Sequence, residues 1–292
     1  MENTRKLPLI LSSFWLKVLA LLTMTIDHVG YLLADYNYDV SNVFRYIGRL
    51  ALPLFCFMIA EGAIHTKSFK KYALRLGIMA SLISLTLIFV EYVPGFNSMR
   101  EQGIIFLDLL LGALAVYLLR QKKWYIKLLA ILPLLYGIGS FIASSLEWCR
   151  CNGYILWFPF FMRTQYGWYA ILTIILFYVA HLLANLFIKY LSSWMNMPEE
   201  YFQNSSIQRH ALNLISVLML IVSSIAFYIC GKMMPSRYVS WDVSMQLFAV
   251  VSGAFILLYS GLRGYNKKWF QYGSYLYYPL HMIVLYLIFS FI

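Results

Sequence analysis

The stretch FWLKVLALLTMTIDHVGYLLA, residues Phe14–Ala34, is long and apolar enough to cross a bilayer as a helix, which requires about 20 residues. The whole chain of 292 residues shares this character, with 62% hydrophobic and only 12% charged residues. Soluble domains carry about 25% charged residues, so this composition excludes a soluble globular protein or a disordered one. The sequence predicts an all-α, polytopic membrane bundle.

We expect one transmembrane domain over residues 1–292 with nine spans. The predicted spans are Phe14–Ala34, Val43–Ile64, Ala73–Val90, Gly103–Leu119, Trp124–Leu146, Tyr166–Phe187, Ala211–Gly231, Val243–Tyr259 and Tyr275–Phe291. The apolar segment Tyr154–Met162 is too short to span and is predicted to lie at the interface, within an outer loop at about 147–165. If it crosses, the number of spans becomes ten. The longest cytoplasmic loop is expected at about 189–210.

The net charge of +11 comes from basic residues that lie in short segments between apolar runs. With nine spans, sixteen Lys and Arg residues fall on the side of the amino terminus and seven on the other. The positive-inside rule therefore places the amino terminus in the cytoplasm. A tenth crossing would move the basic residues of the last loops to the wrong side. This pattern is typical of membrane topology, and no nucleic-acid partner is expected.

The commonest enzyme and metal-site motifs are absent from the sequence. It contains no HExxH, Walker A, GxGxxG or GxSxG motif, and its four cysteines form no CxxC pair. No metal is expected. Cys149 and Cys151 fall in the predicted outer loop, where their redox state is open.

Charged residues within the first two spans are the first candidates for a functional site, because an ionisable group in a bilayer costs about 2.5–3.5 kcal/mol on insertion. At a rise of about 1.5 Å per residue, Asp27 and Arg49 lie at the same depth, roughly 10 Å below the outer surface. We therefore predict an Asp27–Arg49 ion pair, and similarly a Lys17–Glu61 pair near the cytoplasmic end. A purely structural interpretation holds that such pairs only fasten two helices.

Histidines in the first and last spans indicate a function other than holding helices together. No pairing argument requires His28, and a histidine beside a carboxylate such as Asp27 can act as a general base. In the last span Tyr277 and His281 lie one turn apart, around Pro279. An isolated histidine on an apolar helix is often a packing residue, so both interpretations of His281 stay open. Weaker inward-facing candidates are Asp108 and Gln246.

The segment HTKSFKKYALR, His65–Arg75, is a basic stretch on the predicted cytoplasmic side. The positive-inside rule alone explains its lysines. The functional alternative is a rim that attracts the phosphates of an anionic cofactor, and the two interpretations are compatible. The basic rim consists of Lys67, Lys70, Lys71 and Arg75, with a further contribution from Arg120, Lys122 and Lys123.

Four segments of the chain together resemble the TraX family, named for the conjugal pilin N-acetyltransferase. They are LKVLALLTMTIDHVG (Leu16–Gly30), FRYIGRLALPLFCFMIAEGAIHT (Phe44–Thr66) followed by KKYALRL (Lys70–Leu76), QYGWYAIL (Gln165–Leu172), and SGLRGYNKKWFQYGSYLYYPLHMIVLYLI (Ser260–Ile288). The resemblance implies an inner-membrane protein that transfers an acetyl group from acetyl-CoA, as similar transmembrane acyltransferases do. The polar positions it covers are Asp27, His28, Arg45, Arg49, Glu61, His65, Tyr278 and His281.

We therefore expect an acyl-CoA-dependent acetyltransferase whose acceptor is an amine or hydroxyl, on a pilin amino terminus, a glycan or a lipid. His28, oriented by Asp27, would remove the acceptor proton; Arg49 or Tyr278 would stabilise the oxyanion; His281 would be a second proton-transfer group. The expected ligand contacts add Arg45, Glu61 and His65 to the basic rim. Two alternatives remain: a proton-coupled or small-solute transporter, and an assembly protein that uses its charges only to hold helices or partners.

Overall fold

The computed structural model describes residues 9–91, 103–150, 157–203, 206–234 and 243–289. Within these ranges the regular structure is helical, apart from an isolated β-bridge between Leu11 and Tyr259. The predicted all-α class is therefore confirmed. The elements are α1 (Ser13–Leu32), α2 (Tyr38–Gly48), α3 (Ala51–His65), α4 (Phe69–Glu91), α5 (Ile105–Leu119), α6 (Trp124–Leu128), α7 (Ile131–Arg150), η2 (Phe160–Met162), α8 (Trp168–Met195), α9 (Glu199–Phe202), α10 (Ser206–Met233), α11 (Val243–Gln246), η4 (Leu247–Ser252), α12 (Gly253–Leu257) and α13 (Lys268–Phe289).

Five helical stretches in the described ranges are long and apolar enough to cross a membrane. They are Tyr38–His65, Phe69–Glu91, Trp124–Cys149, Trp168–Met195 and Ser206–Met233. Helix α5 and the stretch Val243–Leu257 are apolar but shorter. Helices α1 and α13 are long enough but are not among the five, and both carry the polar residues singled out above. A membrane bundle agrees with these helices, and the number of nine or ten spans stays a prediction.

The second predicted span differs from the observed helices at its start and in its middle. Helix α2 begins at Tyr38 rather than Val43, because the Asn37 side chain accepts a hydrogen bond from the Val40 amide (3.2 Å) and caps the helix. The helix is then interrupted at Arg49 and Leu50 before α3 begins. Arg49 therefore lies at the end of α2, one turn after Arg45.

Two further predicted spans are interrupted. The span predicted over 124–146 consists of α6 and α7, with Pro133 in the first turn of α7, where its missing N–H leaves no helical hydrogen bond unmade. The span predicted over 243–259 consists of α11, η4 and α12. A six-residue 3₁₀ segment is long for this kind of helix. Apolar length thus located both segments, but it carries no information on where the backbone changes its hydrogen bonding.

The connections near residues 154–162 and 189–210 contain more helix than the sequence predicts. Helix α8 continues to Met195, and α10 begins at Ser206, so the predicted 189–210 loop is shorter than expected. No Gly or Pro lies between Lys189 and Met195 to end α8 earlier. The described part of the predicted interfacial segment forms one 3₁₀ turn, η2, after Pro159. Residues 154–156 of that segment lie outside the described ranges.

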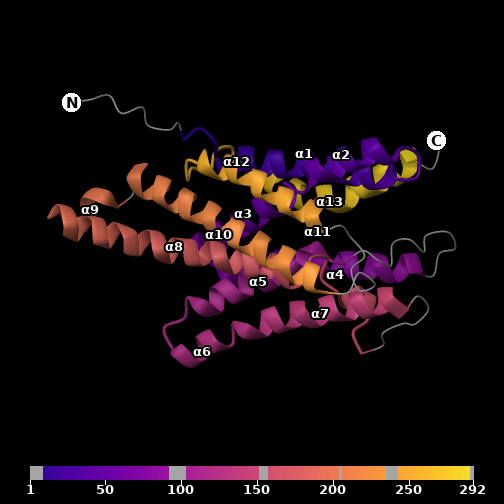
Figure 1. The fold of residues 1–292 in the computed structure, drawn as a ribbon, viewed down its shortest axis with the longest axis horizontal. Helices are drawn as coiled ribbons and strands as arrows, with labels where there is room; N and C mark the ends of the chain where they lie inside the picture. Colours follow the sequence, from indigo (N-terminus) through magenta and orange to yellow (C-terminus); the bar gives the residue numbers. More distant parts are fainter. Residues whose placement is uncertain (1–8, 92–102, 151–156, 204–205, 235–242, 290–292) are drawn as a thin grey trace. The chain divides into compact units, whose positions relative to one another are not determined.

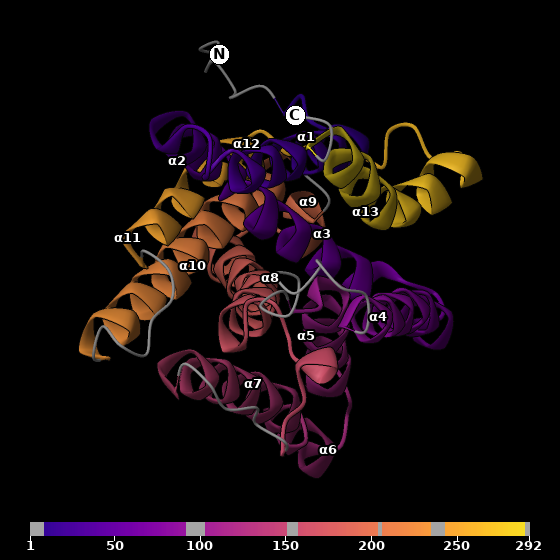
Figure 2. The same ribbon diagram turned by 90° about the vertical axis from the view of Figure 1, so that its right-hand side faces the viewer.

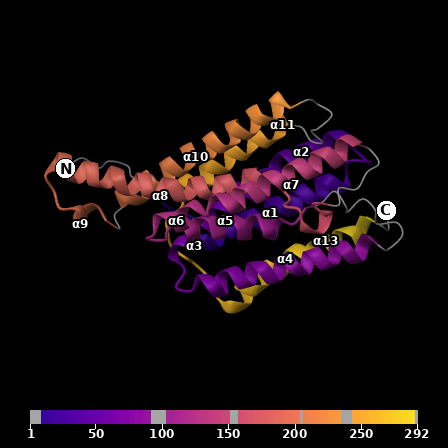
Figure 3. The same ribbon diagram turned by 90° about the horizontal axis from the view of Figure 1, so that it is seen from below.

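Contacts divide the chain into two compact units. The single domain over residues 1–292 stays a prediction. Unit 1 consists of residues 1–54, 179–222 and 248–292. In it, α1 and α2 form a tight helical hairpin, and α13 runs beside α1 (Figures 1 and 2). The second half of α8 packs against the first half of α10 through Ala180, Ala184 and Leu212 (Figures 1 and 3).

Unit 2 consists of residues 55–178 and 223–247. Helix α5 lies between α4 and α7 (Figure 2). The turn η2 is held to α4 by a hydrogen bond from Ser84 Oγ to the Phe161 carbonyl oxygen (2.6 Å). The rings of Phe57 and Phe177 pack edge to face, 5.3 Å between centroids, and both side chains are fully buried. This unit contains the basic segment of Lys67–Arg75.

Candidate functional site

A buried carboxylate with two arginines joins α1 to α2. Asp27 is only 8% exposed, and its two oxygens bind different guanidinium groups. Arg49 Nη2 donates to Oδ1 (2.8 Å), and Arg45 Nη1 donates to Oδ2 (2.7 Å). The predicted Asp27–Arg49 ion pair is confirmed, and Arg45 is a second partner that depth counting did not identify. The cluster has one carboxylate and two guanidinium groups, so it carries a net positive charge.

The close approach of α1 and α2 depends on two glycines. A Cβ at Gly48 would lie 2.2 Å from both Cβ and Oδ1 of Asp27, so any side chain there would displace the carboxylate. A Cβ at Gly30 would lie 2.7 Å from Cβ of Phe44. Beside it, Ser41 Oγ donates to the Gly30 carbonyl oxygen at 2.7 Å. The close approach of α1 and α2 therefore places Arg45 and Arg49 within hydrogen-bonding distance of Asp27.

A pair of histidines joins α1 to α13. His28 Nδ1 lies 2.7 Å from His281 Nε2, and the ring centroids are 4.9 Å apart. His281 Nδ1 lies 2.8 Å from the carbonyl oxygen of Tyr277, one turn earlier, and its ring stacks on the Tyr277 ring with an interplanar angle of 6°. His281 is 6% exposed, whereas His28 is half-buried. The ring of Tyr278 meets both imidazoles edge to face.

A second link between α1 and α13 lies one turn from the histidine pair. Thr25 Oγ1 and Tyr277 Oη are 2.7 Å apart, and Thr25 Oγ1 also donates to the Leu21 carbonyl oxygen at 2.9 Å. The two helices are thus held by two polar contacts from neighbouring turns. His281 is buried and has a contact at each ring nitrogen, which agrees with both interpretations, so its functional role stays a prediction.

The structure therefore brings six of the predicted polar residues into one part of unit 1. They are Asp27, His28, Arg45, Arg49, Tyr278 and His281. The orientation of His28 differs from the expectation, because Asp27 is engaged by the arginines and the hydrogen-bond partner of the His28 ring is His281. Sequence reasoning named both histidines but not their contact. Asp27 and His28, as neighbours on α1, connect the charged cluster to the histidine pair.

The remaining predicted ligand residues lie in unit 2. Glu61 is buried and lies 3.6 Å from His65 Nε2, one turn later on α3. Lys67, Lys70 and Lys71 are exposed, and Arg75 donates from Nε to the Lys71 carbonyl oxygen at 3.3 Å. Arg120 Nη1 donates to the Ala63 carbonyl oxygen (2.8 Å), which adds a cation at the end of α3. Lys17 and Glu61 belong to different units, so their pairing stays a prediction.

The two weaker candidates have structural partners. Asp108 is fully buried, and its Oδ2 accepts hydrogen bonds from the amides of Gln165 (2.7 Å) and Tyr166 (3.3 Å), just before α8 begins. Gln246 is buried near Tyr169, whose hydroxyl lies 3.1 Å from Ser224 Oγ. Both residues thus hold segments of unit 2 together.

A small basic pocket lies where α1 begins. It has a volume of about 120 Å³ and is lined by Ser13, Phe14, Lys17, Arg263, Tyr265, Asn266, Phe270 and Gln271. Lys17 Nζ lies 5.7 Å from the centroid of the Phe270 ring. A lysine and an arginine suit a phosphate group. Sequence reasoning did not single out Arg263, although Gly261 and Gly264 on either side of it both adopt positive φ, which marks a tight turn.

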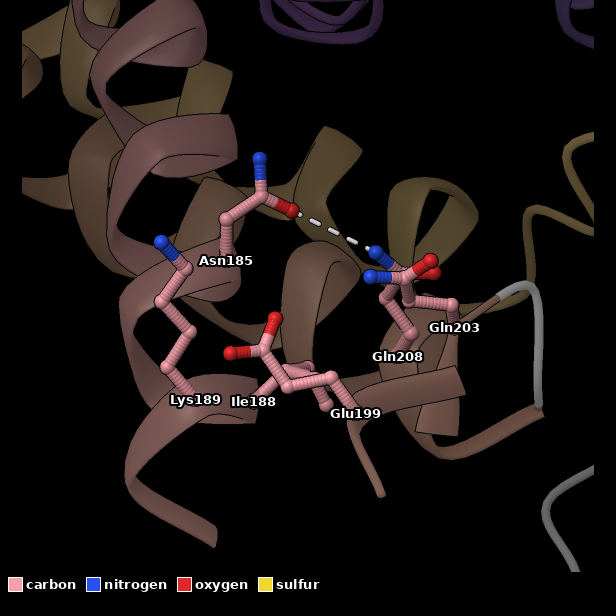
Figure 4. Close-up of a pocket in the computed structure, with 6 residues that line it drawn as sticks. All are labelled: Asn185, Ile188, Lys189, Glu199, Gln203 and Gln208. Carbon is pink, nitrogen blue, oxygen red and sulfur yellow. Dashed lines mark hydrogen bonds between the residues drawn. The ribbon is translucent and has the colours of Figure 1, made fainter. Parts of the chain in front are cut away.

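A larger polar pocket of about 340 Å³ lies between the end of α8, α9 and the start of α10 (Figure 4). It is lined by Asn185, Ile188, Lys189, Glu199, Gln203 and Gln208. A hydrogen bond from Gln208 Nε2 to Asn185 Oδ1 (3.3 Å) closes one side of it. None of the predicted site residues lines this pocket.

The fold and the site define a class of protein: a bundle of apolar helices of membrane-spanning length, with a polar cluster of Asp, Arg, His and Tyr side chains between α1, α2 and α13. The family model described as TraX protein matches residues 12–241. The chain belongs to the TraX family, as its motifs indicate.

Two curated proteins are similar to parts of the chain. The probable fimbrial assembly protein FimC, serogroup H1, of Dichelobacter nodosus is 29% identical over 142 residues, which is 47% of this chain and 57% of that protein. The uncharacterized protein RP591 of Rickettsia prowazekii (strain Madrid E) is 50% identical over 42 residues, 14% of this chain and 15% of RP591. The matches thus cover less than two thirds of either relative. No solved structure matches the chain.

Proposed function

We propose that this chain is a membrane-embedded acetyltransferase that moves an acetyl group from acetyl-CoA to an amine or hydroxyl acceptor at the site formed by α1, α2 and α13. Membership of the TraX family supports the proposal. So does the similarity to a probable fimbrial assembly protein, which favours a pilin amino terminus as the acceptor. The observation that carries the proposal is the His28–His281 contact of 2.7 Å beside the buried Asp27–arginine cluster.

His28 is the proposed general base. It takes a proton from the acceptor amine or hydroxyl as the acceptor nitrogen or oxygen attacks the carbonyl carbon of the thioester. A new C–N or C–O bond forms, and the C–S bond breaks. The departing CoA thiolate then takes the proton from the His28 imidazolium, which returns His28 to its starting state. His28 suits this role because it is half-buried, whereas its partner His281 is almost fully buried.

Charge that develops on the thioester oxygen requires donors close to His28. The ring of Tyr278 lies 6.0 Å from the His28 ring, centroid to centroid, so its hydroxyl is one proposed donor. Arg49 is the other, because Asp27, the neighbour of His28 on α1, holds the Arg49 guanidinium in this site through Nη2 (2.8 Å). Such donors contribute about 3–4 kcal/mol each to acyl transfer.

Acetyl-CoA is a substrate with several phosphates, and basic side chains are the proposed contacts for them. Lys67, Lys70 and Lys71 are exposed and Arg75 is half-buried in the cationic segment of unit 2; Arg120, which follows α5, donates to the Ala63 carbonyl oxygen at the end of α3. The pocket with Lys17 and Arg263 is a second basic group; Lys17 lies on α1, the helix of His28, and Arg263 lies in the connection before α13. Point-charge contacts of this kind give affinity without demanding one fixed geometry.

The proposal is tested with purified protein in lipid nanodiscs, radiolabelled acetyl-CoA and a peptide with a pilin-type amino terminus. We expect release of CoA thiol together with labelled peptide. His28→Ala should lower the rate by at least about 100-fold, because the base is lost, and His181→Ala on α8 is the matched histidine control. Wild-type rates in the His28→Ala protein would overturn the assigned base. Solute flux into liposomes without acyl-CoA, and no acetyl transfer, would favour the transporter alternative.

A further inference from the structure

The hydrogen bonds around His281 determine which nitrogen of His281 carries a proton. A carbonyl oxygen can only accept a hydrogen bond, so the 2.8 Å contact with the Tyr277 carbonyl requires a proton on His281 Nδ1. In a neutral imidazole the other nitrogen then has a lone pair and accepts. His281 Nε2 is therefore the acceptor in the 2.7 Å contact with His28.

This assignment also determines the tautomer of His28. Its Nδ1 must donate to His281 Nε2, so its proton is on Nδ1 and its lone pair on Nε2. In the described part of the chain, His28 Nε2 makes no hydrogen bond to another residue. The opposite arrangement would need a doubly protonated His281. That cation would lie in a site only 6% exposed, with the Asp27 carboxylate already bound by two arginines.

We propose that His281 is a positioning residue that holds His28 in the Nδ1-protonated tautomer and directs the basic Nε2 lone pair of His28 towards the acceptor. This inference rests on the proposed function for its catalytic meaning, but the tautomer is a property of the protein alone. It replaces the role of a second proton-transfer group expected for His281. When His28 takes up a proton, its Nδ1–H bond to His281 remains and stabilises the imidazolium, as a buried hydrogen-bond acceptor does in other histidine bases.

The Thr25–Tyr277 link provides a matched control for the packing of α1 against α13. Thr25 Oγ1 donates its proton to the Leu21 carbonyl, so the Tyr277 hydroxyl is the donor in the 2.7 Å contact between them. Thr25→Val removes this link with little change of volume and leaves the histidine contact in place. A purely structural role of His281 predicts that Thr25→Val and His281→Leu have similar effects.

Nitrogen NMR of protein with ¹⁵N-labelled histidines reads the tautomer directly. The chain has only 5 histidines, so the His28 signals can be assigned by their loss in His28→Ala. We expect His28 to be protonated on Nδ1 in the wild-type and Thr25→Val proteins. His281→Gln should keep that tautomer, because its side-chain carbonyl can accept from His28, whereas His281→Leu should lose it. A wild-type His28 protonated on Nε2 would overturn the inference, whatever the activity.

Kinetics of the same variants test the catalytic meaning. His281→Leu should lower kcat about 100-fold with an unchanged KM for acetyl-CoA, His281→Gln should recover at least about tenfold of that loss, and Thr25→Val should stay within about threefold of wild type. Equal losses in His281→Leu and Thr25→Val would overturn the positioning role. An Nδ1-protonated His28 in a protein without acetyl transfer would support the tautomer assignment and contradict the proposed function, so the two failures are distinguishable.

Discussion

Asp27 shows how a charged side chain is accommodated on a helix that is otherwise apolar. Each carboxylate oxygen accepts a hydrogen bond from a different arginine, so neither oxygen is left without a partner in the buried site. Removing one member of a buried ion pair is more harmful than replacing the whole pair, because the remaining charge is left uncompensated. Asp27 binds two arginines at once, so its loss should be especially harmful.

The first prediction concerns Asp27→Asn. This change removes the carboxylate charge that both Arg45 and Arg49 bind, and we expect it to lower the free energy of unfolding by about 3–5 kcal/mol. Thermal unfolding in detergent micelles measures the effect. Asp35→Asn is the control, since Asp35 is exposed in the turn after α1. An Asp27→Asn protein that unfolds at the wild-type temperature would show that the cluster contributes nothing to stability.

Helices α1, α2 and α13 place the site residues by their periodicity and their close contact. Thr25 and His28 are three residues apart on α1, and Tyr277 and His281 are four residues apart on α13, so each pair lies on one helix face. On the other side of α1, Gly30 and Gly48 allow α2 to approach until Arg45 and Arg49 reach Asp27. The site thus depends on small residues at one contact and on polar side chains at the other.

A substitution at the α1–α2 contact gives the second prediction. Gly48→Ala would place a methyl group 2.2 Å from Asp27 atoms, so the helices must separate, and we expect a loss of about 1–3 kcal/mol in unfolding free energy. Gly273→Ala on α13 is the matched control, because its Cβ would meet no atom within 4 Å and alanine favours a helix over glycine by up to about 1 kcal/mol. The two variants should therefore shift the unfolding temperature in opposite directions. A stabilised Gly48→Ala protein would contradict the close contact.

For the whole molecule, the distribution of basic residues predicts on which side of the membrane each loop lies. The loop with Lys122 and Lys123 belongs to the basic side, which is expected to face the cytoplasm together with the basic rim. The segment around Trp157 belongs to the opposite side. Acetyl-CoA is a cytoplasmic substrate in the proposed function, so this orientation is a requirement of the proposal.

Cysteine accessibility in intact cells tests this orientation. In a variant with the four native cysteines replaced by serine, Trp157→Cys should react with a membrane-impermeant thiol reagent and Lys122→Cys should not, because both residues are exposed but lie on opposite predicted sides. Permeabilised cells provide the control, in which both positions should react. The reverse labelling pattern would place the basic rim outside and contradict its role as a cytoplasmic ligand surface.

Much of the helical framework follows from the sequence, because an apolar run of sufficient length and a capping residue act locally. Six predicted spans each coincide with one helix, to within several residues at the ends. The other three coincide with α2 and α3, with α6 and α7, and with α11, η4 and α12, because the sequence did not indicate the interruptions at Arg49, Leu129 and η4. The Asp27–Arg49 pair was predictable because the two helices follow each other in a hairpin, where depth can be counted from a shared end.

The histidine pair required the folded chain. His28 and His281 are 253 positions apart, and no local pattern indicates that α13 packs against α1 with these faces together. Arg45 as a second partner of Asp27 likewise depends on the glycines that set the distance between α1 and α2. The length of apolar runs and the distribution of charges are properties of the sequence itself, so the sequence predicts them directly. Which side chains meet across helices depends on the packing of surfaces that are far apart in the sequence. That packing makes His281 the hydrogen-bond partner of His28, and the partner determines which His28 nitrogen carries the proton.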